Sequence, residues 1–221
     1  MISLMASPMS SMDLDDVQKA YSRWSRVYDM VFGPTFATAR RRAVAMLELQ
    51  EGERVLEVGV GTGLSFPEFP LSCSAYGIDI SRPMLKRAKA RARRPGTGIA
   101  EADACQLPFG NDAFDAALIP YVLSAVPDPI GLLQEAVRVV RPDGSIVLLN
   151  HFMSDNKMLA ACERLVTKTT TRLLGFHADL AVDPALEAVG LRVVASRRVP
   201  PLRYWQALCV VAANGNGALD G

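Results

Sequence analysis

The stretch VLEVGVGTG, residues 55–63, decides how this chain folds. An apolar run leads directly into three glycines, Gly59, Gly61 and Gly63, and the residues that follow have a helical pattern. A strand that enters a glycine-rich turn and then a helix is typical of nucleotide-binding sheets, because a residue without a Cβ atom lets a ligand approach the backbone. The stretch therefore predicts a nucleotide-type turn at the end of a buried strand.

The spacing of the glycines and the residue before them narrow the choice of ligand. The dinucleotide fingerprint needs a glycine at position 64, which is Leu64 here, and a phosphate loop needs a lysine that TGLSF does not contain. Glu57 stands two residues before Gly59. A carboxylate there would repel a pyrophosphate but would attract a ligand that carries an ammonium and a sulfonium. These features favour S-adenosylmethionine.

Apolar runs that alternate with helical stretches extend outward from this turn. Such alternation predicts an α/β fold with a doubly wound parallel sheet, because parallel strands are joined by crossover helices that pack on the sheet faces. The last two runs are separated only by PPL, which is too short for a crossover, so we expect an antiparallel terminal hairpin. The six runs interpreted as strands are RVLEVGV (54–60), SAYGIDI (74–80), FDAALIP (114–120), GSIVLLNHF (144–152), LRVVASRRV (191–199) and RYWQALCVVAAN (203–214).

Aromatic residues are concentrated near the start of the chain, in residues 20–36. Tyr21, Trp24 and Tyr28 recur at helical spacing, which predicts a helix that ends at Gly33-Pro34, and a second helix follows over about residues 35–49. The aromatic stripe suits an element at a lipid headgroup boundary, or one that docks over the protein's own site. Both interpretations predict N-terminal helices added to the sheet.

Composition and charge set limits on location and partners. The chain has 221 residues, half of them apolar, and a formal net charge of +1, which is the composition of one soluble globular domain. No apolar run approaches the roughly 18 residues that cross a bilayer, and the opening residues lack the features of a secretory signal, so we expect a cytoplasmic protein. Basic residues cluster in 82–94 and 40–42, either on solvated helix faces or as a surface attracted to an anionic partner such as lipid or nucleic acid.

The four cysteines are widely scattered, with no CxxC pair and only two histidines to supplement them. This spacing argues against structural zinc and against a disulfide framework. We expect free thiols at Cys73, Cys105, Cys162 and Cys209.

Two further acids stand where the nucleoside part of the ligand would lie. Asp79 closes the second strand, where it can accept hydrogen bonds from both ribose hydroxyls, or can instead cap the following helix. Asp103, in EADACQLPF between the SAYGIDI and FDAALIP runs, could accept from the adenine amino group or could be a turn residue. Together with the glycine loop, these positions resemble the class I S-adenosylmethionine-dependent methyltransferases over roughly residues 50–155.

That resemblance implies a Rossmann-like seven-stranded sheet that ends in an antiparallel strand. It also implies S-adenosylmethionine as cofactor, with S-adenosylhomocysteine as its product. The chain then divides into a helical lid or membrane-contact segment (1–49), a methyltransferase domain (50–214) and a flexible tail (215–221). The residues expected to contact the cofactor are Glu57, Gly59, Gly61, Gly63, Asp79, Ile80, Met84, Asp103 and Ala104.

Segments outside the glycine loop point to an acceptor. YDMVFGP (28–34), PYVLSAVPDP (120–129), LLGFHADL (173–180) and VPPLRYWQ (199–206) resemble the bacterial phosphatidylethanolamine N-methyltransferases, which are related to the ubiquinone and menaquinone methyltransferases. The resemblance implies stepwise N-methylation of phosphatidylethanolamine towards phosphatidylcholine, at the anionic inner face of the membrane. C- or O-methylation of a quinone precursor or another small apolar acceptor is an alternative, and a non-catalytic cofactor-binding module is a third. We expect a monomer, and neither a metal nor a nucleic-acid partner.

Methyl transfer is an in-line displacement, so the chain must align donor and acceptor and exclude water. Aromatic faces can bind methylated ammoniums, and a neighbouring polar group must take the proton of the acceptor amine. We assign these roles to Tyr28, Tyr121 and His151, each of which could instead be structural. Lys168, Thr169 and Arg172 are expected at the lipid phosphate, and Arg23, Trp24 and Arg26 at the membrane.

Overall fold

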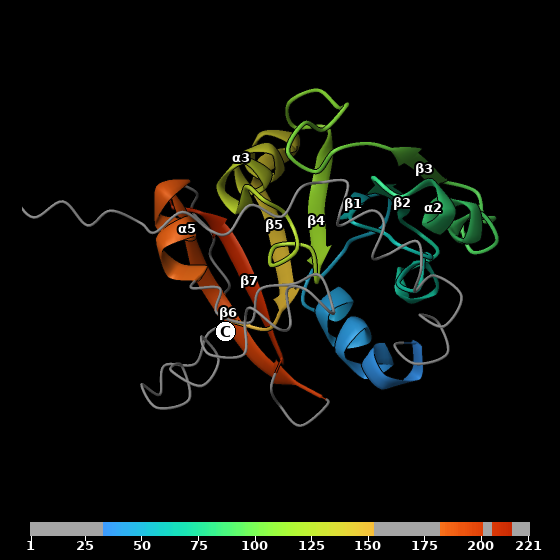
Figure 1. Cartoon of the computed structure of the whole chain (residues 1–221), viewed down its shortest axis with the longest axis horizontal. Helices are drawn as coiled ribbons and strands as arrows, with labels where there is room; N and C mark the ends of the chain where they lie inside the picture. The colour runs from blue at the N-terminus through green and yellow to red at the C-terminus, as the bar shows by residue number, and fades with distance from the viewer. Residues whose placement is uncertain (1–32, 153–181, 201–204, 214–221) are drawn as a thin grey trace, which may run out of the picture.

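The computed structural model describes residues 33–152, 182–200 and 205–213, and these contain one seven-stranded sheet. Its strands are β1 (Arg54–Val58), β2 (Ser74–Asp79), β3 (Thr97–Glu101), β4 (Phe114–Pro120), β5 (Val140–Asn150), β6 (Leu191–Val199) and β7 (Trp205–Ala212). They follow the order β3-β2-β1-β4-β5-β7-β6, shown in Figure 1. The first five are parallel, and β7 runs antiparallel to both β5 and β6. The expected doubly wound sheet and terminal hairpin are confirmed.

β3 is the strand to which the sequence pattern assigned no bounds. Its five residues, TGIAE, are partly or fully exposed because β3 lies at the edge of the sheet and pairs only with β2. An exposed edge strand needs no continuous apolar run, so periodicity alone does not mark it.

Each face of the sheet has its own apolar core. α3 (Pro129–Val139) and α5 (Val182–Ala188) cover one face, where Leu56 and Val58 of β1 point. α2 (Arg82–Ala88), the short η1 helix (Phe66–Glu68) and a helix over residues 33–45 cover the other face, towards which Val55 points. Because side chains alternate along a strand, Glu57 lies on the same face as Val55 and as the 33–45 helix.

The 33–45 helix packs through a stripe of residues three and four apart. Ala39, Ala43 and Val44 join the core beneath it, and Phe36 is also buried. The helix expected over about 35–49 is therefore confirmed, although its last helical residue is 45. Gly33 and Pro34 are themselves helical, whereas the sequence pattern predicts that the second helix begins after them.

The basic run 82–94 contributes to the fold as well as to the surface. Arg91 donates to the carbonyl oxygen of Thr62 at 2.7 Å, and Arg94 donates to that of Phe69 at 2.8 Å. These two arginines tie the segment after α2 to the glycine loop and to the end of η1. Lys86 and Lys89 remain exposed, so only part of the run is a solvated face.

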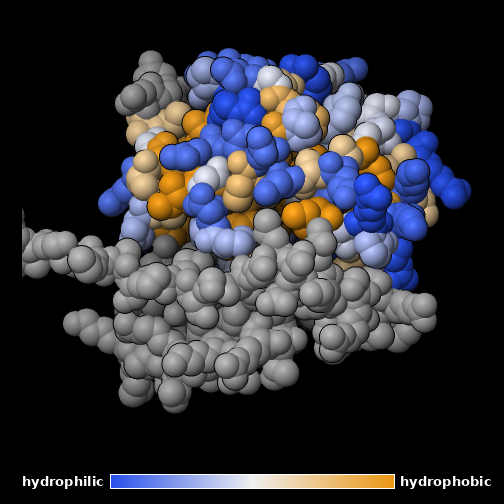
Figure 2. All heavy atoms as spheres, turned by 45° about the horizontal axis from the view of Figure 1, so that its top comes forward, coloured by the Kyte–Doolittle hydropathy of each residue, from blue (hydrophilic) through white to orange (hydrophobic). Residues whose placement is uncertain are grey.

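The surface of the described residues is mixed in character. Figure 2 shows hydrophilic residues interspersed with smaller hydrophobic areas on the face turned to the viewer. Within 33–152, 182–200 and 205–213, the exposed large hydrophobic residues are Leu71, Ile130 and Val193, and no helix is long and apolar enough to cross a membrane. Cys73, Cys105 and Cys209 are free thiols, as expected, and Cys162 lies outside the described residues.

Candidate functional site

A pocket lies at the carboxyl ends of β1 and β4, two neighbouring strands. The chain passes from β1 to β2 on one side and returns to β4 on the other, so this is the point where the strand order reverses. Open α/β sheets bind ligands at such a point. Glu57 and the glycine loop line one side of the pocket, Pro120 and Tyr121 line another, and Arg40 reaches it from the 33–45 helix.

The three glycines of the loop have positive φ angles of 73°, 53° and 80°. At Gly59, a Cβ atom would lie 2.0 Å from the Cγ2 atom of Val122, whereas at Gly61 it would meet nothing within 4 Å. At Gly63, a Cβ atom would press on the ring of Phe66 and on Ala88 of α2. Gly61 therefore leaves open space for a ligand, and Gly59 and Gly63 permit close packing within the protein.

The backbone N–H groups of the loop are largely engaged by the protein. Gly59 and Val60 both donate to the carbonyl oxygen of Ile78 at 2.8 Å, and Gly63 donates to that of Val60 at 2.8 Å. Gly61 donates to the Oδ2 atom of Asp79 at 2.8 Å. The loop thus has a fixed shape, but these four donors are not free for an anionic ligand.

Glu57 is a buried acid whose side chain faces the pocket. It is 2% exposed, and its Oε2 atom accepts no hydrogen bond from any residue that the structure describes. Burial raises the pKa of Glu57 to about 8, although a hydrogen bond with Ser65 and the charge of Arg40 act in the opposite direction. An ammonium group beside Oε2 would supply the missing hydrogen bond and stabilise the carboxylate. This site fits the methionyl ammonium of S-adenosylmethionine.

Asp79 stands at the carboxyl end of β2, as expected. Its Oδ1 atom accepts from the backbone N–H of Ser81 at 2.8 Å, while Oδ2 accepts from Gly61. Burial raises its pKa, and these two hydrogen bonds lower it. Asp79 therefore fixes both the glycine loop and the start of α2. A carboxylate oxygen has more than one lone pair, so ribose hydroxyls can still donate to it.

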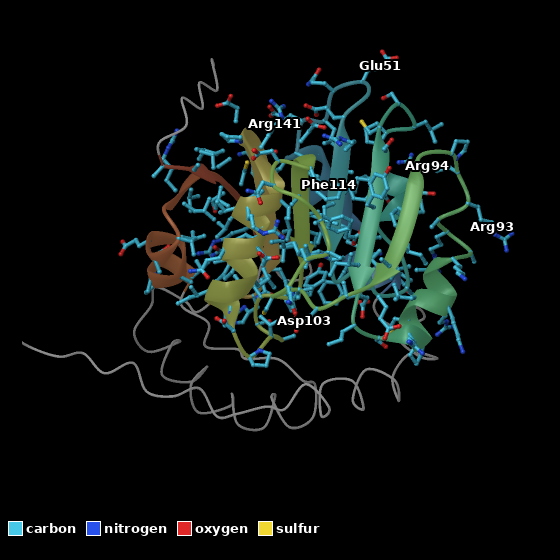
Figure 3. The ribbon with its side chains drawn as sticks, turned by 90° about the horizontal axis from the view of Figure 1, so that it is seen from above. Glu51, Arg93, Arg94, Asp103, Phe114 and Arg141 are labelled. Atoms are coloured by element: carbon cyan, nitrogen blue, oxygen red, sulfur yellow. The ribbon has the colours of Figure 1, made fainter. Side chains whose placement is uncertain are left out.

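Asp103 lies at the same edge of the sheet, after β3. Figure 3 shows it at the end of the molecule opposite to Glu51 and Arg141. Its Oδ1 atom accepts from the backbone N–H of Cys105 at 2.8 Å, which is the turn geometry that we considered as the alternative. Ile80 and Met84 lie after β2, with Met84 buried in α2, and Ala104 is buried beside Asp103.

Tyr121 lines the pocket and has a strained backbone, with φ of 64°. Its backbone N–H donates to the carbonyl oxygen of Leu149 at 2.6 Å. Its ring centroid lies 5.3 Å from that of Phe36 and 5.2 Å from that of Trp205, and the last two are 5.1 Å apart. These three residues, here called the aromatic triad, join the 33–45 helix to the ends of β4 and β7.

His151 follows β5 and is 4% exposed. Its ring centroid lies 5.9 Å from that of Trp205, so it borders the aromatic triad, but it does not line the pocket. The other predicted acceptor and membrane residues lie outside the described residues; they are Arg23, Trp24, Arg26, Tyr28, Lys168, Thr169 and Arg172. The roles predicted for these residues from the sequence therefore remain predictions.

Arg40 and Trp205 are the site residues that sequence reasoning missed. We placed Arg40 in a solvated or lipid-facing basic cluster with Arg41 and Arg42, but Arg40 is 7% exposed and lines the pocket, whereas its two neighbours are exposed. The signal was present, because Arg40 falls four residues after Phe36 on the apolar stripe of its helix. Trp205 had no such local signal, since it depends on the placement of β7 beside β5.

The 33–152, 182–200 and 205–213 segments contain no group of histidines, cysteines and acids that could hold a metal ion. The buried orphan oxygen of Glu57, the open space at Gly61 and the acid at Asp79 together match an amino acid joined to a nucleoside. The geometry therefore supports S-adenosylmethionine, as the sequence predicted.

Known proteins resemble this chain in sequence and in fold. Residues 56–148 match a family described as methyltransferase domain. The chain is 38% identical over 187 residues to a phosphatidylethanolamine N-methyltransferase of Cereibacter sphaeroides, which covers 80% of this chain and 91% of that protein. It is 34% identical over 155 residues to a demethylmenaquinone methyltransferase of Tropheryma whipplei (strain Twist), which covers 68% of this chain and 64% of that protein. A chain in the complex of the Haloferax volcanii Trm112 methyltransferase activator with a methyltransferase has a TM-score of 0.73 at 18% identity, covering 90% of this chain and 99% of that chain.

Proposed function

Because the chain belongs to the class I S-adenosylmethionine-dependent methyltransferases, we propose that it methylates the amino group of phosphatidylethanolamine, stepwise towards phosphatidylcholine. The observation that carries this proposal is the extent of the likeness to a phosphatidylethanolamine N-methyltransferase, which runs through most of both chains. The likeness to the demethylmenaquinone methyltransferase covers a smaller part of each.

In this proposal, residues at or just after the carboxyl ends of β1, β2 and β3 hold the donor. Glu57 accepts hydrogen bonds from its ammonium, Asp79 from its ribose hydroxyls and Asp103 from its adenine amino group. The fixed glycine loop sets the depth at which the donor lies, because its backbone is tied to Ile78 and Asp79. When bound, the donor would supply a methyl group on a sulfonium. An amine can attack this methyl carbon, and the thioether leaves in the same step.

The acceptor amine reaches the methyl group from the side of Tyr121, which lines the same pocket as Glu57. The amine nitrogen uses its lone pair to form the new N–C bond as the S–C bond breaks, and one proton leaves for each methyl group added. The phenol oxygen of Tyr121 accepts a hydrogen bond from the amine and orients its lone pair, and its ring offers a π face to the more methylated products. His151 and Tyr28 remain the other candidates for the proton.

A quinone precursor is the second candidate acceptor, and the likeness to a demethylmenaquinone methyltransferase favours it. The aromatic triad could pack against an apolar ring as well as beside an ammonium. The two functions differ in the atom methylated, which is nitrogen in the lipid headgroup and carbon or oxygen in the quinone.

The experiment incubates the full chain with S-adenosylmethionine labelled in its methyl group and with vesicles that contain phosphatidylethanolamine. Parallel samples contain phosphatidylcholine vesicles, which lack a free amine, or vesicles loaded with a demethylquinone. We expect label in mono-, di- and trimethylated lipid, resolved by thin-layer chromatography, and none in the other two samples. If the protein binds S-adenosylhomocysteine but only the quinone is labelled, the proposal is wrong and the second candidate function takes its place.

We infer as well that the protein acts as a peripheral protein at the anionic inner face of the membrane. The aromatic and basic residues Arg23, Trp24 and Arg26 would supply this contact. Removal of residues 1–32 should therefore weaken cosedimentation with anionic vesicles, and added salt should weaken binding of the full chain, because salt screens attraction to charged lipid. Equal cosedimentation of the two forms would exclude this segment as the membrane contact.

A further inference from the structure

Two adjacent arginines stand where β6 ends and β7 begins. Arg197 and Arg198 are both exposed, near the end of β6. Arg198 pairs with Gln206 of β7, and Gln206 also pairs with Asn150, the last residue of β5. Because β5 runs parallel to β4, the two arginines lie at the carboxyl edge of the sheet, the edge that holds the pocket. Figure 1 shows the end of β6 on the same side of the molecule as the ends of β4 and β5.

These arginines lie beside the aromatic triad. Trp205 pairs with Val199, two residues after Arg197, and both Trp205 and Val199 pack in the core beneath the 33–45 helix. Side chains alternate along a strand, so Arg197 points to the same face as Val199. Arg197 and Trp205 are therefore diagonal neighbours on that face. Arg198 points to the opposite face, so the two arginines place positive charge on both faces of the hairpin at this edge.

The charges of these two arginines are not balanced within the fold. Neither guanidinium forms an ion pair with an acid that the structure describes. At the amino edge, by contrast, Arg54 and Arg141 both pair with Asp115. Charge on an edge strand also discourages pairing with another chain, but a single arginine such as Arg192 serves that purpose without a second beside it. Two adjacent unpaired cations indicate a surface that attracts an anionic partner.

The partner that this surface fits best is anionic lipid. Arg197 and Arg198 are exposed and do not line the pocket, which suits a diffuse layer of anions better than one small phosphate. Each arginine near an anionic membrane adds to the attraction, and a neighbouring tryptophan is typical of residues at the headgroup boundary. The proposed function also requires that a phospholipid reach Tyr121 from a membrane, and Tyr121 packs against Trp205.

We propose that Arg197 and Arg198 form a second membrane contact, which docks on anionic phospholipid and turns the acceptor side of the site towards the bilayer. This assignment rests on the proposed function, because it takes the acceptor to be a lipid. It differs from the contact inferred for residues 1–32, because it lies on the sheet itself and fixes which edge of the sheet faces the membrane.

The test measures vesicle binding by the full chain in the absence of methyl donor and of phosphatidylethanolamine. The vesicles contain phosphatidylcholine alone, or phosphatidylcholine mixed with phosphatidylglycerol, and binding is followed by cosedimentation. The double variant Arg197→Gln with Arg198→Gln should bind the mixed vesicles about 10- to 30-fold more weakly, and each single variant about three- to fivefold more weakly. Binding to phosphatidylcholine alone should not change, because that surface carries no net charge.

The matched control is the double variant Arg93→Gln with Arg192→Gln. It removes the same net charge from two exposed arginines, one in the loop before β3 and one near the start of β6, both towards the amino edge. Its binding to the mixed vesicles should change less than about twofold. Both double variants should bind S-adenosylhomocysteine as the natural protein does, since none of the four arginines lines the pocket.

Three results would overturn the proposal. Equal losses in the two double variants would indicate attraction by net charge alone, without a preferred edge. Unchanged vesicle binding in the hairpin variants would exclude this surface as a membrane contact. Unchanged vesicle binding together with a loss of affinity for a DNA duplex would identify nucleic acid as the partner instead. The single variants keep the test decisive if the double variant does not fold. Because no methyl transfer is measured, failure here is distinct from failure of the lipid methylation assay.

Discussion

The two edges of the sheet place their charges in opposite environments. At the carboxyl edge, Glu57 and Arg40 are 2% and 7% exposed. At the amino edge, Arg141 pairs with Glu53 at 3.0 Å and with Asp115 at 3.1 Å, and its side chain is 43% exposed. Figure 3 shows Arg141 at the end of the molecule opposite to Asp103. Exposed ion pairs neither cost nor contribute much, whereas buried charged groups are costly unless they are paired and hydrogen-bonded. Under the proposed function, the amino edge serves the fold and the carboxyl edge serves the donor.

The strongest test of this comparison places an alanine at a positive-φ glycine on each edge. Gly59→Ala should reduce the free energy of unfolding by about 2–4 kcal/mol, because the new Cβ atom collides with Val122 in addition to the φ strain. Gly52, before β1, has φ of 83° and nothing within 4 Å of the position that a Cβ atom would take, so Gly52→Ala should cost only about 1 kcal/mol. Urea unfolding measures both. Equal losses would show that the crowding at Gly59 is relieved at no cost.

Removing the buried acid should separate stability from binding. The pKa of Glu57 is raised from 4.5 to about 8, so the folded protein holds this proton more tightly than the unfolded chain. Its contribution to stability is fully present below about pH 4.5 and is lost as pH rises to about 8. Glu57→Gln has no such dependence, so it should be more stable than the natural protein by up to about 3 kcal/mol at pH 7, and by little at pH 4.5.

The same variant should lose donor affinity by about 100-fold, because a neutral amide cannot pair with an ammonium. Urea unfolding at pH 5 and pH 8, with titration of S-adenosylhomocysteine at pH 8, measures the two effects. A stability gain that is the same at both pH values would contradict the titration of Glu57, and intact donor affinity would contradict its role.

The features that sequence reasoning found are those encoded locally. The strand, the glycine spacing and Glu57 all fall within residues 55–63, so this part of the predicted donor site came from one short stretch. Trp205 joins the aromatic triad only because β7 inserts between β5 and β6, a non-local pairing that periodicity does not reveal. Arg40 was missed for another reason, since an arginine on an apolar stripe was grouped with its exposed neighbours instead of being counted with the stripe.

Tyr121 tests whether the carboxyl edge also serves the acceptor. Tyr121→Phe keeps the ring that packs on Phe36 and Trp205, so donor affinity and stability should change little, while kcat should fall about 10- to 100-fold if the phenol oxygen orients the amine. Tyr76→Phe is the matched control, because Tyr76 packs against Phe114 in the core on the opposite face of the sheet. Initial rates of methyl transfer and titration of S-adenosylhomocysteine measure the effects. Unchanged turnover in Tyr121→Phe would leave Tyr121 with a packing role alone.

The smallest effect is expected at the amino edge. Arg141→Gln removes both ion pairs of Arg141, but Asp115 still accepts from the backbone N–H of Arg54 at 2.8 Å, so no buried group loses its partner. The free energy of unfolding should fall by less than about 1 kcal/mol, and the loss should shrink in about 1 M salt because these pairs are solvent-accessible. Affinity for S-adenosylhomocysteine should be unchanged, since Arg141 lies at the opposite end of the sheet from the pocket. If this variant instead bound the donor more weakly, the two edges would be coupled through β4 and β5, and the division between a structural edge and a ligand-binding edge would fail.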